Sequence, residues 1–271
     1  MRHHEPATRA MSRRCVRRLL PAAVFGIIFC VGAVHGGAQA PAAGRKYTGP
    51  RTPDGKPNLN GIWQTMTTAQ WDLEAHSAAD GMPAGVSLVE GETIPYKPEA
   101  LAKKKENLAN REKLDPLNKC YLPGVPRITF IPFPFQVTQT PKYIVMNFEY
   151  QHATRIIYMD SPHAPPNDFW MGDSRGRWDG DTLVVDVTHF NDSTWFDKAG
   201  NHHSDALHVI ERYTPLEAGH VMHYEATIED PNVFTRPWKI NLPIYRRAEQ
   251  NMQLLDYDCV DFFWKQIRSS R

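Results

Sequence analysis

The sequence has 271 residues, with 31 Lys and Arg residues against 30 Asp and Glu residues, and its formal net charge at pH 7 is +1. Residues 1–40 hold six of the basic residues and one of the acidic residues, so residues 41–271 carry 25 basic and 29 acidic side chains. This slightly acidic balance gives no basic face for a phosphate backbone, and we expect no nucleic-acid partner. A chain of this length can bury one sizeable core.

Residues 1–40 are predicted to be a removable signal peptide. Four arginines between positions 13 and 18 precede an uncharged stretch, residues 19–40, that ends in the small-x-small pattern Ala38-Gln39-Ala40. The alternative is a permanent membrane anchor. The stretch contains Pro21 and is short for a span of roughly 20 strongly apolar residues, so no stable anchor is expected. The predicted location is periplasmic or secreted.

Residues 41–58 are predicted to form an extended leader, because they are rich in Pro, Gly and charge without apolar periodicity. Residues 59–271 then form a single β-rich domain. Within it, residues 75–96 have no clear period and indicate a long surface loop. Residues 98–114 carry a thin apolar stripe between many charges, which predicts one surface helix.

Two of the four cysteines, Cys15 and Cys30, leave with the predicted signal peptide. The remaining pair, Cys120 and Cys259, would lie in an oxidising compartment, where a disulfide is expected. Chain-entropy arguments give such a long-range bond a contribution of roughly 3 to 5 kcal/mol. Two buried free thiols are the alternative.

Short runs rich in Val, Ile, Tyr, Phe and Thr follow Cys120, and turn residues separate them. The Asp179-Gly180 pair predicts a hairpin. The predicted strands are residues 135–140, 143–149, 154–159, 182–190, 207–213, 221–228, 238–244 and 254–260. This spacing predicts a mostly β fold, either a barrel or a sandwich. We favour an antiparallel, lipocalin-like barrel with a pocket, one surface helix and long loops.

The segment 200–212 is the first candidate for a functional site, since it concentrates acid–base and ligand side chains. His203, His208 and Glu211 are candidate catalytic residues, and His203 and His208 are candidate ligands of a single Zn²⁺ or Fe²⁺ ion. On a regular strand His208 and Glu211 point to opposite faces, so they would meet only across a bulge. The alternative is a loop of solvated histidines, with Glu211 and Arg212 in cross-strand pairs.

A second candidate cluster contains His152 and Arg155. The histidine could act as a general acid or base, and the arginine could bind an anionic or carbonyl group. An exposed histidine at a turn is the alternative for His152. On the strand from Thr182, alternation places Asp186 opposite the apolar face and predicts a solvent-facing carboxylate, with a pocket position as the alternative.

Ring faces beside polar side chains suit sugars or planar ligands. Trp170 and Trp195 are candidate ligand contacts, because each lies in a polar loop. Asn191, in the loop of Trp195, and Arg212, a candidate anion-binding group, complete the predicted ligand-binding set. The sequence lacks the P-loop, G-x-G-x-x-G and C-x-x-C patterns, which leaves nucleotide enzymes and redox dithiols without support.

Residues 51–63 read R-T-P-D-G-K-P-N-L-N-G-I-W. This stretch resembles the R-T-P-D-G-K-P-x-L-x-G-x-W opening of an uncharacterised family of secreted proteins from environmental bacteria. Further similar stretches are residues 120–127, 170–172, 176–185, 190–192, 194–195 and 204–208. The chain departs from the family at Asn201, where a G-H-x-H pattern is usual. The resemblance implies export and a common fold.

Three functions are therefore open. The first is an exported β-barrel that binds a small molecule in a pocket lined by aromatic and His side chains. The second is a periplasmic lyase, isomerase or hydrolase that uses His, Asp and Arg acid–base chemistry, with or without a divalent metal. The third is a structural envelope protein.

Overall fold

The computed structural model describes residues 47–259, except 80–81, 165–166 and 217. The predicted signal peptide lies outside the described residues. The described residues belong to one compact unit. Within the described part of the chain, no helix has the length and apolar character needed to cross a membrane.

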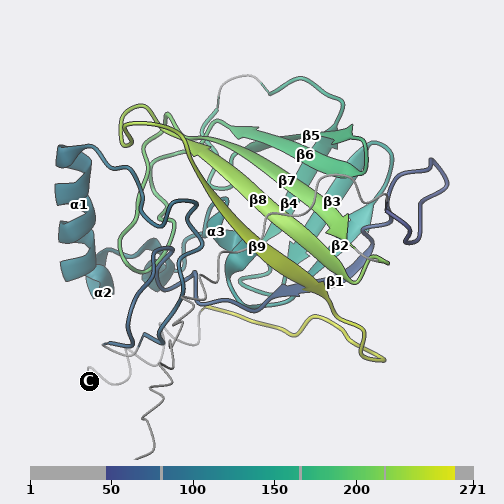
Figure 1. The fold of residues 1–271 in the computed structure, drawn as a ribbon, viewed down its shortest axis with the longest axis horizontal. Helices are drawn as coiled ribbons and strands as arrows, with labels where there is room; N and C mark the ends of the chain where they lie inside the picture. Colours follow the sequence, from purple (N-terminus) through teal and green to yellow (C-terminus); the bar gives the residue numbers. More distant parts are fainter. Residues whose placement is uncertain (1–46, 80–81, 165–166, 217, 260–271) are drawn as a thin grey trace, which may run out of the picture. The chain divides into compact units, whose positions relative to one another are not determined.

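The described chain folds into a closed nine-stranded barrel (Figure 1). Its strands are β1 (Gly61–Thr65), β2 (Phe135–Gln139), β3 (Tyr143–Phe148), β4 (Thr154–Met159), β5 (Asp173–Asp179), β6 (Thr182–Thr188), β7 (His208–Leu216), β8 (Val221–Glu229) and β9 (Trp238–Arg246). Each strand pairs with the next along the chain, and β9 closes the barrel against β1. The prediction of a mostly β barrel is confirmed.

The barrel is mixed rather than purely antiparallel, because β4 and β5 are parallel. The chain leaves β4 at Met159 and re-enters the barrel at Asp173, running in the same direction as β4. Parallel neighbours need a connection of about a dozen residues or more, and residues 160–172 supply it. The sequence patterns missed both β1 and β5. The predicted strand at 254–260 is wrong over its described part, which forms only an isolated bridge from Tyr257 to Tyr150.

Strict alternation of buried and half-buried residues along β7 and β8 shows one face of each strand turned into the barrel. The inward side chains are large and almost fully covered, and they include Trp63, Phe135, Tyr213, Tyr224 and Ile240. On β6, Asp186 is half-exposed on the outer face, as predicted. Thr182 and Val184, which the alternation places on the same face, are buried. The barrel interior is thus a packed core.

The short helices lie in the long connection between β1 and β2. The predicted helix at 98–114 is present but breaks at Asn110, which gives α1 (Pro98–Ala109) and α2 (Arg111–Leu114). The short η1 (Pro116–Lys119) and α3 (Arg127–Phe130) follow. All four residues of α3 are buried, and Arg127 forms a two-bond ion pair with Asp115.

Residues 51–63, which we call the opening motif, begin with a folded turn at residues 51–57 rather than an extended leader. Residues 41–46 of the predicted leader lie outside the described residues. The Thr52 N–H donates to the Lys56 carbonyl at 2.9 Å, and Arg51 forms an ion pair with Asp181 at 2.8 Å. Arg246 lies over the Trp63 ring at 4.3 Å and donates to backbone carbonyls, including that of Asn60. Because Trp63 and Arg246 pair across β1 and β9, this contact fastens the seam of the barrel.

Cys120 and Cys259 form the predicted disulfide across a separation of 139 residues. Their Cα atoms lie 5.6 Å apart. The bond joins the end of η1 to the C-terminal segment.

A substitution at Gly200 tests the close contact between the loop at residues 197–201 and α1. A Cβ at Gly200, whose φ is +84°, would meet the Lys104 carbonyl and the Leu108 amide at 2.8 Å. We expect Gly200→Ala to cost about 1–2 kcal/mol for the left-handed backbone and about 1–3 kcal/mol for overpacking. Gly55 has φ +80° and open space around it, so Gly55→Ala should lose only the stability that the left-handed backbone costs. Urea unfolding of both variants checks this, and equal losses would contradict the docking.

Candidate functional site

Two of the predicted catalytic residues, Arg155 and Glu211, meet inside the barrel. They form a two-bond ion pair, and each side chain is at most 1% exposed. Arg155 Nε also donates to Ser174 Oγ at 3.0 Å. Glu211 Oε1 accepts from the hydroxyls of Tyr213 at 3.0 Å and Tyr224 at 2.8 Å. The pair is fully hydrogen-bonded and closed to solvent, which favours a structural role.

His152 does not join Arg155. It lies exposed at the β3–β4 turn with φ +50°, while the Arg155 side chain points into the barrel. The next residues on β4 repeat the alternation, so only every second side chain enters the core. The predicted His152–Arg155 cluster is therefore split between the solvent and the interior.

His203 is buried, and both of its ring nitrogens have protein partners. Its Nε2 lies 2.6 Å from Thr194 Oγ1 and its Nδ1 lies 2.8 Å from the Ser204 carbonyl, while the ring packs on Phe196. Burial lowers the pKa of the imidazole. His203 is therefore neutral near pH 7, with both ring nitrogens in use.

The predicted ligand-binding residues are dispersed. Trp195 is buried, whereas Trp170 packs against Tyr121 at a ring-centroid distance of 4.9 Å. Asn191 caps its own loop by accepting from the Ser193 N–H at 3.1 Å. Arg212 lies on the outer face of β7, in an exposed ion pair with Asp179. The structure does not bring these four residues into one pocket.

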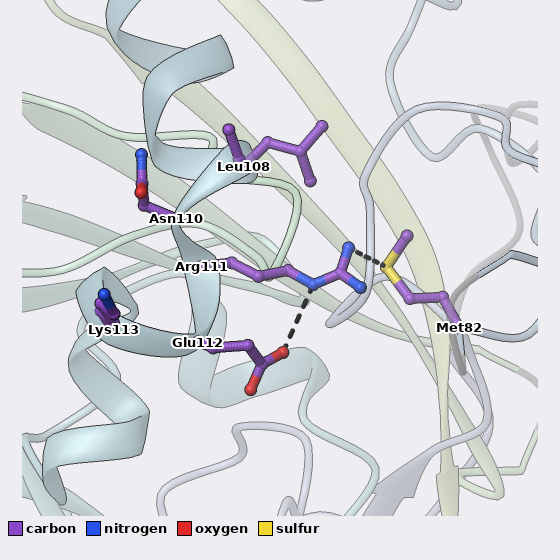
Figure 2. Close-up of a pocket in the computed structure, with 7 residues that line it drawn as sticks. Met82, Leu108, Asn110, Arg111, Glu112 and Lys113 are labelled. Carbon is purple, nitrogen blue, oxygen red and sulfur yellow. Dashed lines mark hydrogen bonds and ion pairs between the residues drawn. The ribbon is translucent and has the colours of Figure 1, made fainter.

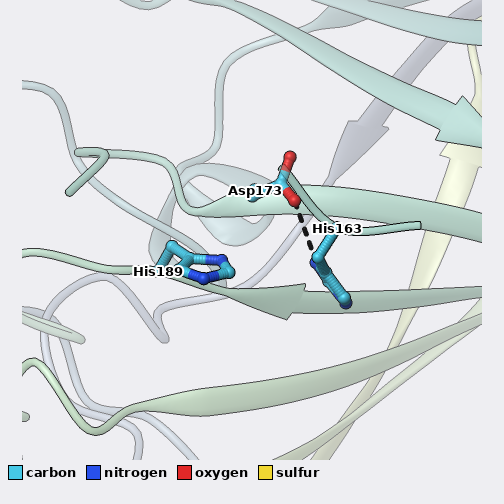
Figure 3. A group of neighbouring side chains, drawn as sticks. All are labelled: His163, Asp173 and His189. Carbon is cyan, nitrogen blue, oxygen red and sulfur yellow. Dashed lines mark hydrogen bonds and ion pairs between the residues drawn. The ribbon is translucent and has the colours of Figure 1, made fainter. Parts of the chain in front are cut away.

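A cluster that the sequence patterns missed lies where the β4–β5 connection meets the start of β5 and the end of β6. One possible ligand atom from each of His163, Asp173 and His189 lies within 4.8 Å of the other two (Figure 3). His163 comes from the β4–β5 connection, Asp173 begins β5, and His189 directly follows β6. We call these three residues the metal-candidate centre.

Strand register and loop pairing hold this centre together. Asp173 pairs with Thr188 across β5 and β6, so the carboxylate lies beside the end of β6. A bridge between Phe169 and Phe190 fastens the connecting loop to the segment after β6. The Thr188 hydroxyl lies 3.2 Å from His163 Nδ1 and 3.0 Å from His189 Nδ1. The two imidazoles therefore turn toward a common hydroxyl.

Asp173 is an ionised carboxylate. Burial acts to raise its pKa, but hydrogen bonds from Arg175, the Ala164 N–H and His163 outweigh burial and lower the pKa. Its Oδ2 accepts from His163 Nδ1 and the Ala164 N–H, each at 2.9 Å, and Arg175 binds both oxygens. Arg175 thereby fixes the carboxylate and offsets part of its charge.

The donor set suits a borderline divalent cation. Two imidazoles and one carboxylate are ligands that Zn²⁺ and Fe²⁺ accept, and a hydroxyl or water can complete the set. Two atoms bound to one tetrahedral zinc ion lie roughly 3.3 Å apart. His163 Nδ1 and Asp173 Oδ2, at 2.9 Å, are already near that spacing.

The spacing of these three residues in the sequence matches no local metal-binding pattern. His163 stands ten residues before Asp173, and His189 follows sixteen residues later, on three different segments. The available signal was the predicted solvent face of the strand from Thr182, which carries Asp186 and Thr188 and leads directly to His189. The β4–β5 crossover that brings in His163 had no counterpart in the sequence patterns.

His208, predicted as a metal ligand, lies on the same outer face. Its Nε2 lies 2.9 Å from Asp186 Oδ1, and its Nδ1 lies 3.6 Å from Glu229 Oε2. His163 Nε2 faces the same Asp186 oxygen at 3.4 Å. His208 and His203, the two predicted ligands, are thus on different parts of the barrel.

Cavities are found elsewhere. One of about 610 Å³ lies where α1 meets α2, and it is lined by Met82 and residues 108–113. In Figure 2, Arg111 extends toward the Met82 sulfur and also contacts Glu112. Another, of about 520 Å³, lies beside the opening motif. Loop and element-end residues line both cavities, and neither contains a residue of the metal-candidate centre.

We expect loss of the interior ion pair between Arg155 and Glu211 to lower stability strongly. Glu211→Gln should lower the free energy of unfolding by about 3–5 kcal/mol, because it leaves the buried Arg155 charge uncompensated. Arg212→Gln, the next residue on β7, should leave stability nearly unchanged, because its ion pair with Asp179 is exposed. Urea denaturation measures both variants. A small effect of Glu211→Gln would show that the interior pair does not support the barrel.

His203 predicts a pH dependence of stability. Its folded-state pKa lies below the unfolded value of about 6.5, so the unfolded chain takes up a proton that the folded chain resists. Stability is therefore present above about pH 6.5 and is lost as the pH falls. Melting temperatures between pH 7.5 and 5.5 should fall less steeply for His203→Gln than for the wild type. The control His152→Gln, at an exposed site, should keep the wild-type dependence of melting temperature on pH. An unchanged dependence in His203→Gln would show that His203 is not the group responsible.

Comparisons with known proteins do not place the chain in a family. No protein-family model matches it, and a search of curated proteins finds no significant match. The function proposed below rests on the geometry of the metal-candidate centre.

Proposed function

We propose that this chain is an exported β-barrel protein that binds a divalent transition-metal ion, with Zn²⁺ the best fit, at the metal-candidate centre. The observation that carries this proposal is the convergence of His163, Asp173 and His189 within 4.8 Å on the outer face of the barrel. Asp173 supplies the negative charge, and the two imidazoles supply nitrogen ligands that suit zinc.

The surroundings support a built site. Asp173 is buried and held by Arg175 and a backbone N–H, which gives the carboxylate one orientation. His163 is about one-third exposed, so an ion can reach it from solvent. The Cys120–Cys259 disulfide supports export, because such bonds persist in oxidising compartments.

Of the three functions expected from the sequence, metal binding on the outer face bears differently on each. A small molecule inside the barrel finds little support, because paired and close-packed side chains fill the interior. The same outer face would serve the enzyme alternative, with the metal as a Lewis acid or as a source of bound hydroxide. A structural envelope role requires no selective metal binding, so metal binding separates it from the other two.

Removal of one ligand tests the proposal. Full chain from the exported fraction should bind Zn²⁺ in calorimetry, and His189→Gln should weaken that binding at least about tenfold. The matched control is His223→Gln, an outer-face histidine of β8 that lies outside the centre. Absence of Zn²⁺ binding in the wild type, or equal affinity in His189→Gln, would overturn the proposal.

A further inference from the structure

The cavity beside the opening motif, of about 520 Å³, lies between two turns. Residues 51–54 of the opening motif line one side, and residues 139–141, at the end of β2 and the start of the turn to β3, line another. Pro53, Asp54 and Pro141 are exposed, so the cavity is open to solvent. Small-molecule sites have volumes of roughly 300–1,000 Å³, and this cavity lies within that range.

Hydrogen bonds between the opening motif and β2 fix the polar side of this cavity, which Asn58, Asn60 and Gln139 form. The Leu59 N–H donates to Gln139 Oε1 at 2.8 Å, and the Gln139 N–H donates to Asn60 Oδ1 at 2.7 Å. Asn60 Nδ2 donates to Asn58 Oδ1 at 2.8 Å. These bonds hold the three side chains in one arrangement before a ligand binds, which lowers the entropic cost of binding.

Two carboxamide groups on the polar side are left as oriented donors. The Asn60 N–H donates to Asn58 Oδ1 at 3.0 Å, as the Leu59 N–H does to Gln139 Oε1. Because a backbone N–H can only donate, these bonds fix which end of each carboxamide is the NH₂ group. Within the described residues, neither Asn58 Nδ2 nor Gln139 Nε2 has a hydrogen-bond partner. A ligand oxygen can therefore accept from either group without displacing a protein contact.

The charges that line the cavity favour a neutral ligand. Arg51 binds the two oxygens of Asp181 at 2.8 and 3.1 Å, so the guanidinium charge is already balanced. Asp54 Oδ1 accepts from the Thr52 hydroxyl, whereas Asp54 Oδ2 accepts no hydrogen bond within the described part of the chain. Asp54 thus offers an acceptor to a ligand hydroxyl, and its negative charge repels an anion.

Hydroxyl groups suit this lining, because each hydroxyl both donates and accepts. The free NH₂ groups of Asn58 and Gln139 supply donors, and Asp54 supplies an acceptor. Pro53 and Pro141 add apolar ring surface to the same cavity, against which the C–H face of a sugar ring can pack. A sugar combines these features without a charged group.

We propose that this cavity binds a neutral carbohydrate unit. The NH₂ groups of Asn58 and Gln139 donate to its hydroxyl oxygens, and Asp54 accepts from one of its hydroxyls. None of these residues belongs to the metal-candidate centre, so the carbohydrate site does not depend on the proposed metal. The opening motif then has two roles, because it closes the barrel and also forms a ligand site.

Sugar titrations of the full chain test this proposal. The probes are maltose, lactose and chitobiose, three neutral disaccharides, and calorimetry should show that the wild type binds at least one of them. Asn58→Asp and Gln139→Glu each keep the oxygen that accepts a backbone N–H but remove the NH₂ donor. Each change should weaken binding of that sugar at least about fivefold. The matched control is Gln136→Glu, at an exposed position of β2 outside the cavity, which should keep the wild-type affinity.

A wild type that binds none of the three sugars overturns the proposal. Wild-type affinity in both Asn58→Asp and Gln139→Glu also overturns it, because the sugar would then occupy another part of the molecule. Unchanged melting temperatures of the sugar-free proteins establish that each variant is folded.

The charge of the ligand gives a second test, at an exposed residue. The wild type should bind glucose more tightly than glucuronic acid, and Asp54→Asn should reduce that difference. Tighter binding of glucuronic acid by the wild type would show that the cavity selects an anion, which overturns the assignment of a neutral carbohydrate.

Discussion

The ion pair between Arg155 and Glu211 is the interaction on which the described barrel most depends. Arg155 comes from β4 and Glu211 from β7, and Arg155 also holds Ser174 on β5. The network therefore crosses the parallel β4–β5 junction, which has only three paired positions. Because each buried group has a partner, the barrel accommodates two charges without an unpaired ion.

That junction also positions the metal-candidate centre. A parallel pairing requires a crossover connection, and His163 lies in this connection, where its Nδ1 is 2.9 Å from Asp173 Oδ2. The first residue after the crossover is Asp173, which the strand pairing places beside Thr188. The interior network and the metal-candidate centre thus lie on opposite faces of the same part of the barrel wall. Inward residues fill the core, and some of the alternate residues, such as Asp186 and His208, are partly exposed to solvent.

The opening motif has a structural explanation. Arg51 reaches the β5–β6 turn, and Trp63 fills the core under the Arg246 guanidinium. Gly61 has φ +132°, and a Cβ there would meet Arg246. Glycine is needed because the guanidinium occupies the space of a side chain while it binds three backbone carbonyls. The motif closes the barrel and does not contribute to the metal-candidate centre.

The sequence by itself determined the mostly β barrel, the Asp179-Gly180 hairpin, the Cys120–Cys259 disulfide and the outward direction of Asp186. These follow from alternation, turn chemistry and cysteine number, which are properties of short segments or of composition. Only the tertiary structure decided that Arg155 meets Glu211 and that His163 meets Asp173 and His189. Those contacts depend on the order and direction of non-adjacent segments around the barrel, which local periodicity does not encode.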